Sequence, residues 1–166
     1  MNIRAFTLLE TLVAVSVLLM ALLGPFTIAS QSLRSAFYAR DQVTAFYLAQ
    51  EGIEYVRAVR DQNYLSGNDW MESLDLCTGV PCTVDMKNFE HALCPENNCA
   101  PLTIDINSIF SQRTGAGYTP SKFTRVVSLT EIAGNPDQKI VSVTVSWQSV
   151  GITRSFTIRE RIFDWL

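Results

Sequence analysis

One long apolar run near the N-terminus constrains this chain more than any other feature. Residues 5–25 read AFTLLETLVAVSVLLMALLGP, and Glu10 is the only charged side chain among them. The 23 residues from Phe6 to Ile28 exceed the about 20 that a helix needs to cross a bilayer. A carboxylate within such a segment costs free energy, so it usually has a function. The run therefore predicts a membrane helix in which Glu10 has a specific task.

Length and charge limit what accompanies this helix. The chain has 166 residues and a formal charge of −3, which allows one domain of about 100 residues beside the membrane segment. No block of Lys or Arg occurs, so we expect no nucleic-acid partner. The apolar run is longer than the about 7–15 residues of a secretory signal. A plain signal anchor explains membrane insertion but not the presence of Glu10. The basic residues Arg4, Arg34 and Arg40 lie on both sides of the apolar run, so they do not fix the orientation of the helix in the membrane.

The segment Ala5-Phe6-Thr7-Leu8-Leu9-Glu10 resembles the class III signal of type IV prepilins and type II secretion pseudopilins. In that family a short basic leader is removed just before a Phe, the Phe is N-methylated, and a Glu follows at the fifth mature position. The resemblance implies a leader of residues 1–5, cleavage between Ala5 and Phe6, and methylation of Phe6. Where the family usually has Gly before the cleaved bond, this chain has Ala5.

The same resemblance implies a role for Glu10. Cleavage leaves the Phe6 amine in apolar surroundings, where an unpaired charge is costly. Glu10 of one subunit is expected to neutralise the Phe6 amine of another, which sets the register of otherwise nonspecific helices. The implied partners are other pilin subunits, a prepilin peptidase, an inner-membrane assembly platform and, before assembly, membrane lipid. The chain is expected to cross the cytoplasmic membrane once and then to enter an extracellular or periplasmic filament, as a structural subunit without enzymatic activity or cofactor.

The helix is expected to continue beyond the membrane. Gly24-Pro25 resembles the helix-breaking site of many pilins, because Pro lacks the donor for one helical hydrogen bond. No further Pro occurs from Ser30 to Arg60, so residues 29–62 are read as an amphipathic continuation of the 6–28 helix, about 55 residues in all. Apolar residues at three- and four-residue steps predict a stripe that packs in a core. This stripe consists of Val43, Phe46, Ala49, Ile53, Val56 and Val59.

The remaining sequence changes period. Residues 63–122 are rich in Pro, Gly and Asn and are read as loops, with short extended pieces at 82–85 and 102–106. From residue 123 apolar and polar residues alternate in three segments, which predicts a three-stranded antiparallel meander over 123–166. The expected fold is α+β and pilin-like, with the long helix packed on this sheet. The strand Val-Thr-Val-Ser-Trp and the ending Asp164-Trp165-Leu166 are similar to minor pilins and pseudopilins of the PilV and GspI type.

Four cysteines form two closely spaced pairs, Cys77 with Cys82 and Cys94 with Cys99. A four-cysteine zinc site is possible, although structural zinc sites more often use two-residue gaps. Outside the cytoplasm disulfides form and persist, so disulfides are favoured. The local pairing Cys77–Cys82 and Cys94–Cys99 is preferred, with the nested pairing Cys77–Cys99 and Cys82–Cys94 close behind.

No catalytic set is evident elsewhere. His91 is the only histidine, and no motif surrounds it, so it is expected to be exposed or loosely packed. Asp69, Glu72 and Asp75 lack the pattern of a calcium loop and are expected to be a solvated loop. The alternative to a filament subunit is a membrane-anchored extracytoplasmic binding module that never polymerises, with a disulfide- or zinc-stabilised head. An anchored enzyme has almost no support from the residues.

Overall fold

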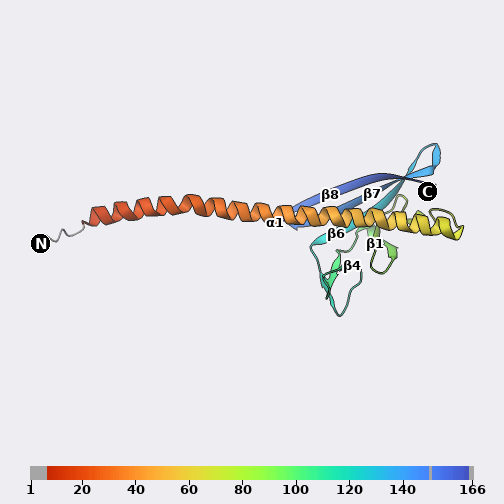
Figure 1. The fold of residues 1–166 in the computed structure, drawn as a ribbon, viewed down its shortest axis with the longest axis horizontal. Helices are drawn as coiled ribbons and strands as arrows, with labels where there is room; N and C mark the ends of the chain where they lie inside the picture. Colours follow the sequence, from red (N-terminus) through yellow and green to blue (C-terminus); the bar gives the residue numbers. More distant parts are fainter. Residues whose placement is uncertain (1–6, 150, 165–166) are drawn as a thin grey trace. The chain divides into compact units, whose positions relative to one another are not determined.

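The computed structural model describes residues 7–149 and 151–164 (Figure 1). Within this part the chain forms two compact units, one up to Asp41 and one from Gln42 onward. The first unit is the N-terminal part of helix α1, which runs over Leu8–Ser66. The second unit, called the head here, holds the rest of α1 and all described strands. The expected leader, with Ala5, and the expected new N-terminus at Phe6 lie outside the described residues.

Local sequence signals define both ends of α1. Thr7 caps the first turn, because its Oγ1 accepts a hydrogen bond from the Glu10 backbone N–H at 3.3 Å. Gly67, with a φ of 73°, follows the last helical residue. The Asn68 N–H donates to the Asn63 carbonyl at 3.0 Å, a C-terminal motif that needs this left-handed residue. The resulting helix of 59 residues is slightly longer than the sequence predicted.

The expected helix break at Gly24-Pro25 is not found, since α1 is continuous through both residues. Pro25 leaves one helical acceptor without its N–H donor. Neighbouring Leu and Ala residues favour the helix, so the loss of one bond is tolerated.

The head contains a five-stranded antiparallel sheet of order β2-β1-β6-β7-β8. Its strands are β1 (Cys82–Asp85), β2 (Glu90–Leu93), β6 (Phe123–Ile132), β7 (Asn135–Ser149) and β8 (Ile152–Phe163). The alternating pattern correctly indicated the meander β6-β7-β8, in which Val143 pairs with Val127 on one side and Ile158 on the other. The prediction of only three strands was wrong, because the hairpin β1-β2 extends the sheet beyond β6.

The region expected to be loops is more ordered than predicted. It contains η1 (Leu74–Cys77), the β1-β2 hairpin, η2 (Pro95–Asn97) and a second antiparallel sheet of order β4-β3-β5. The strands of this small sheet are β3 (Thr103–Asp105), β4 (Phe110–Ser111) and β5 (Tyr118–Pro120). The predicted extended piece at 82–85 is β1, and the piece at 102–106 contains β3. The other short elements have no periodic sequence pattern.

Helix α1 covers one face of the large sheet within the head (Figure 1). Of the predicted stripe, Ala49, Ile53, Val56 and Val59 are buried in the same hydrophobic core as Val127, Val143 and Trp147. The prediction was wrong for the start of the stripe, because Val43 and Phe46 remain 54% and 39% exposed. The apolar stripe thus begins at residues of α1 that the core of the head leaves exposed.

Candidate functional site

The N-terminal part of α1 presents an apolar surface without intrachain cover. The large apolar side chains that the structure describes between Leu8 and Ile28 are all at least half exposed. By length and composition α1 could cross a membrane. This finding indicates membrane anchoring.

The polar side chains in this segment are satisfied within the helix. The hydroxyls of Thr11, Ser16 and Thr27 donate to backbone carbonyls three or four residues earlier, at 2.8–2.9 Å. Hydrocarbon offers no hydrogen-bond partner, so polar groups in a membrane must find partners within the protein. Thr11, Ser16 and Thr27 meet this requirement.

Glu10 differs from these residues. It lies in the first turn of α1, where the helix dipole favours a negative charge, and its side chain is exposed. Among residues 7–149 and 151–164 no partner is found for its carboxylate. From Leu8 to Leu33 it is the only charged residue. The carboxylate is therefore available to a group from outside the described chain.

Comparison with known proteins does not assign a family. No family model, no curated protein and no solved structure matches this chain. Its function is therefore inferred from the sequence and the geometry of the described residues.

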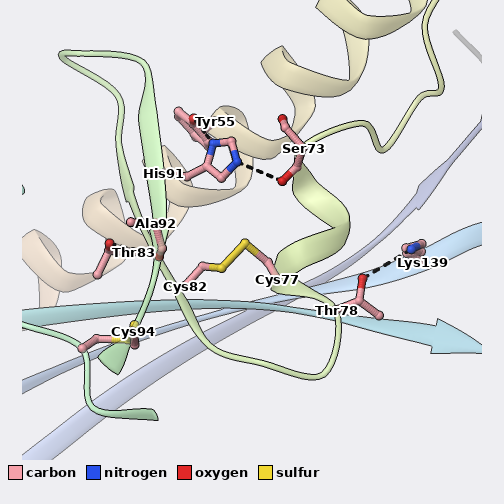
Figure 2. The surroundings of a disulfide bond; sticks show 11 residues. Tyr55, Ser73, Cys77, Thr78, Cys82, Thr83, His91, Ala92, Cys94 and Lys139 are labelled. Atoms are coloured by element: carbon pink, nitrogen blue, oxygen red, sulfur yellow. Dashed lines mark hydrogen bonds between the residues drawn. A yellow bond between two sulfur atoms is a disulfide. The ribbon is translucent and has the colours of Figure 1, made fainter. Parts of the chain in front are cut away.

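Two disulfides stabilise the head (Figure 2). Cys77 at the end of η1 is bonded to Cys82 at the start of β1, and Cys94 is bonded to Cys99 across η2. This is the local pairing that the sequence favoured over the nested one. All four sulfurs are used, which removes the ligands of the alternative zinc site, and no other His, Cys, Asp or Glu cluster in the described chain fits a metal ion. Disulfides indicate an oxidising, extracytoplasmic location.

His91 connects three segments of the head, as Figure 2 shows. Its Nε2 lies 3.0 Å from the Ser73 carbonyl, which can only accept, so Nε2 carries the proton. Nδ1 then accepts from the Tyr55 hydroxyl at 2.7 Å. Burial, followed by the charges of Asp85 and Glu90, raises the pKa of Tyr55 to about 12. The expectation of a loosely packed His91 was therefore wrong, and its role is to join α1, β2 and the segment before η1.

A buried arginine, which the sequence did not reveal, holds the helix to the sheet. The side chain of Arg125 on β6 is 1% exposed. Its guanidinium donates to the Leu48 carbonyl on α1 at 3.1 Å and to the Val84 carbonyl on β1 at 2.7 Å. Glu51 on α1 lies 3.4 Å away and balances its charge. Burial lowers the pKa of Arg125 while Glu51 opposes this effect. These partners hold the Arg125 side chain in place, so its charge has a structural role.

Two buried carboxylates attach the small sheet to the large one. Asp85 accepts hydrogen bonds from the Ser111 hydroxyl at 2.6 Å and from the Gln112 N–H at 2.8 Å. Burial raises the pKa of Asp85, but these donors and Asn88 together outweigh burial and lower it. Asp105 accepts from Lys87 at 2.6 Å. Both acids are saturated with intrachain donors, so neither is poised for proton transfer.

Two of the three acidic residues before β1, Asp69 and Asp75, have intrachain partners. Asp69 accepts from the Met71 N–H at 2.9 Å, and Asp75 pairs with Lys139 at 2.7 Å. The Lys139 Nζ also donates to the Thr78 hydroxyl oxygen at 3.3 Å (Figure 2). The expectation of a solvated loop is confirmed, because Asp69, Glu72 and Asp75 are all exposed. The ion pair of Asp75 with Lys139 additionally ties this loop to β7. Glu10, by contrast, has no partner for its carboxylate among the described residues.

Proposed function

We propose that this chain is a pilin-like structural subunit that enters a type IV pilus or a secretion pseudopilus through its N-terminal helix. One observation carries the proposal: a lone carboxylate, Glu10, lies on the first turn of an uncovered apolar helix, four residues after Phe6 in an Ala5-Phe6-Thr7-Leu8-Leu9-Glu10 segment. A lipid anchor needs the apolar surface but not the carboxylate. A helix that must recognise other helices needs both.

The proposed mechanism starts with hydrolysis of the peptide bond between Ala5 and Phe6 by a prepilin peptidase, which leaves a free amine on Phe6. In an apolar bundle that ammonium group and the Glu10 carboxylate are each costly alone. Pairing the Phe6 amine of one subunit with Glu10 of another removes the cost of both buried charges. The pair can form in only one register of the two helices. Buried polar pairs are best known for setting register in this way. An assembly platform extracts the subunit from lipid as its helix joins the filament.

The head is consistent with a structural role. Its two disulfides suit an extracytoplasmic position, and its buried charges are held by intrachain partners. We infer a minor rather than a major pilin from the similarity of its last two strands to the PilV and GspI type. No catalytic role is proposed for any residue.

The test compares two neutral substitutions on α1. Glu10→Gln keeps the size of the side chain and removes its charge, so the chain is expected to insert into the membrane but not to enter filaments. Glu54→Gln, at an exposed glutamate of the head, is expected to assemble normally. Filament incorporation is measured by immunoblot of sheared filaments, and the N-terminus of the wild-type chain by mass spectrometry.

Two results would overturn the proposal. One is normal incorporation of Glu10→Gln, which would remove the need for the charge pair. The other is an intact Met1, or a mature N-terminus near Ser30, in the wild-type chain. Either N-terminus would favour a membrane-anchored module that does not polymerise.

A further inference from the structure

Strand β8 is a long free edge of the large sheet. It comes last in the strand order β2-β1-β6-β7-β8, and within the described chain β7 is its only strand partner. The pairing with β7 runs without interruption from Ile152 to Phe163, so every second residue of β8 turns its N–H and C=O groups away from the sheet. Such a row of unpaired donors and acceptors is a template for a further strand.

Most devices that protect sheet edges are missing from β8, a strand that the structure describes in full. Natural proteins protect edges by short strands, Pro, β-bulges or covering elements. Strand β8 has 12 residues, contains no Pro or Gly and shows no register shift against β7, whereas the opposite edge strand, β2, has only four residues. The close approach of α1 at Gly52 is to β7, one strand further in, and Ile152 remains 54% exposed.

Charged side chains are the remaining protection of an edge, and those of β8 are self-complementary. Two copies related by a two-fold axis perpendicular to the sheet pair their β8 strands antiparallel, with opposed residues on the same face. When the axis passes through Thr157, Arg154 of each copy lies opposite Glu160 of the other, because both residues are three positions from Thr157. Opposite charges that face each other across a strand pair stabilise it, and like charges destabilise it.

The other opposed pairs in this register are also compatible. Each remaining arginine of β8 faces a hydroxyl side chain, and apolar residues face one another. These pairs are Ser155 with Arg159, Thr153 with Arg161, Phe156 with Ile158 and Ile152 with Ile162. Neighbouring registers lack this match. An axis through Phe156 or Ile158 leaves both members of the charged pair opposite apolar residues, and an axis through Arg159 places that arginine opposite its own copy.

We propose that β8 pairs antiparallel with β8 of a second copy of this chain, in the register centred on Thr157. The contact joins the two five-stranded sheets into one. Glu160 is available for it, because Arg57 contacts its Oε1 atom and a carboxylate also accepts at its second oxygen. The proposal goes beyond the filament function, since it concerns the heads and depends neither on cleavage before Phe6 nor on Glu10.

Cysteine cross-linking tests the register. Thr157→Cys places two thiols at the two-fold axis, where the spacing of opposed residues, about 4.5–5.5 Å between Cα atoms, suits a disulfide. The full chain is oxidised with copper phenanthroline in dodecyl maltoside micelles, which do not fix the relative direction of the N-terminal segments. Thr130→Cys is the matched control, because Thr130 is an exposed threonine on the same face of the sheet but in β6. Position 157 is expected to give a disulfide-linked dimer, and position 130 several-fold less.

Charge exchange tests the two ion pairs. Arg154→Glu places a carboxylate opposite Glu160 of the other copy, so self-association in the same micelles is expected to weaken at least about fivefold, measured by analytical ultracentrifugation. Glu160→Arg alone is expected to weaken it as well. A mixture of the two variants restores both pairs of opposite charges and is expected to associate as strongly as the wild-type chain. Recovery in the mixture also shows that each variant is folded.

Any of three results would overturn the edge pairing. They are equal dimer yields at positions 157 and 130, a wild-type chain that stays monomeric, and unchanged self-association of Arg154→Glu. A mixture that stays as weak as its components would overturn the register. These outcomes leave the filament proposal untouched, because the purified chain is tested without the assembly machinery. An intact Met1 in cells would overturn the filament function and leave the edge pairing standing.

Discussion

Gly52 of α1 lies so close to Val143 of β7 that a Cβ atom at residue 52 would be 2.8 Å from the Val143 Cγ1. Carbon atoms do not approach this closely without displacement, so the absence of a side chain at Gly52 sets the distance between helix and sheet. The Arg125 Cδ lies 3.4 Å from the same position. Helix α1, strand β7 and the buried arginine of β6 therefore form one packed unit.

Gly52→Ala is expected to destabilise the head. Overpacking costs about 1–3 kcal/mol, whereas the gain in helix propensity is at most about 1 kcal/mol. We expect a net loss of up to about 2 kcal/mol in the free energy of unfolding, measured by urea denaturation. Gly24→Ala is the control, because nothing lies within 4 Å of a Cβ there, and it is expected to leave head stability unchanged. An equal effect of the two substitutions would contradict the close approach of Gly52.

Two substitutions of Arg125 separate the contribution of its packing to stability from the contribution of its hydrogen bonds. Arg125→Met and Arg125→Ala both remove the donors to Leu48 and Val84, but only Ala also leaves a large cavity. Truncation of a buried Met to Ala lowers the free energy of unfolding by about 2–5 kcal/mol. We expect Arg125→Met to be more stable than Arg125→Ala by about that amount in urea unfolding. Equal stabilities would mean that the surrounding core collapses into the space.

The raised pKa of Tyr55 predicts that the head loses stability at high pH. Its pKa is raised from 10.0 to about 12 in the folded chain. Between these values the unfolded chain has lost the phenolic proton while the folded chain retains it, so the free energy of unfolding falls as pH rises. Tyr55→Phe removes this contribution, and its stability is expected to decline less steeply over the same range. Denaturation at several pH values measures the two slopes, and identical slopes would refute the assignment.

The sequence predicts the periodic parts of this fold and misses the parts that individual side chains hold. Helix α1 and the strands β6, β7 and β8 follow from their apolar spacing. The small sheet depends instead on Asp85 and Asp105, whose donors come from distant residues. Such contacts have no sequence period, so the region was read as loops.

The same limit applies to the candidate site and its surroundings. Periodicity shows that Val43 and Phe46 belong to an apolar face, but it does not show where the head stops covering that face. Alternation does place Arg125 on the same face of its strand as Phe123 and Val127, but it does not show which partners hold a charged side chain there. Glu10 could be singled out from sequence because one charge in an apolar run is conspicuous, and the structure adds its position in the first turn.

The two disulfides should contribute unequally to stability. Each joins residues five positions apart, so the entropic effect of closing the loop is about 2 kcal/mol for both. Cys77 and Cys82 belong to the main hydrophobic core, however, whereas Cys94 and Cys99 do not. Replacing the first pair with serine places hydroxyls in the core, at about 1–3 kcal/mol for each one left without a partner. We therefore expect Cys77→Ser/Cys82→Ser to unfold at lower urea concentration than Cys94→Ser/Cys99→Ser.

Alanine variants of the same pairs distinguish the two causes. Cys77→Ala/Cys82→Ala loses the covalent link without adding hydroxyls, so its stability should lie closer to that of Cys94→Ala/Cys99→Ala. If the serine and alanine variants of the first pair are equally stable, polarity is not the cause, and loop closure alone accounts for the loss. If both pairs contribute equally in every variant, the hydrophobic surroundings of Cys77 and Cys82 have no energetic consequence.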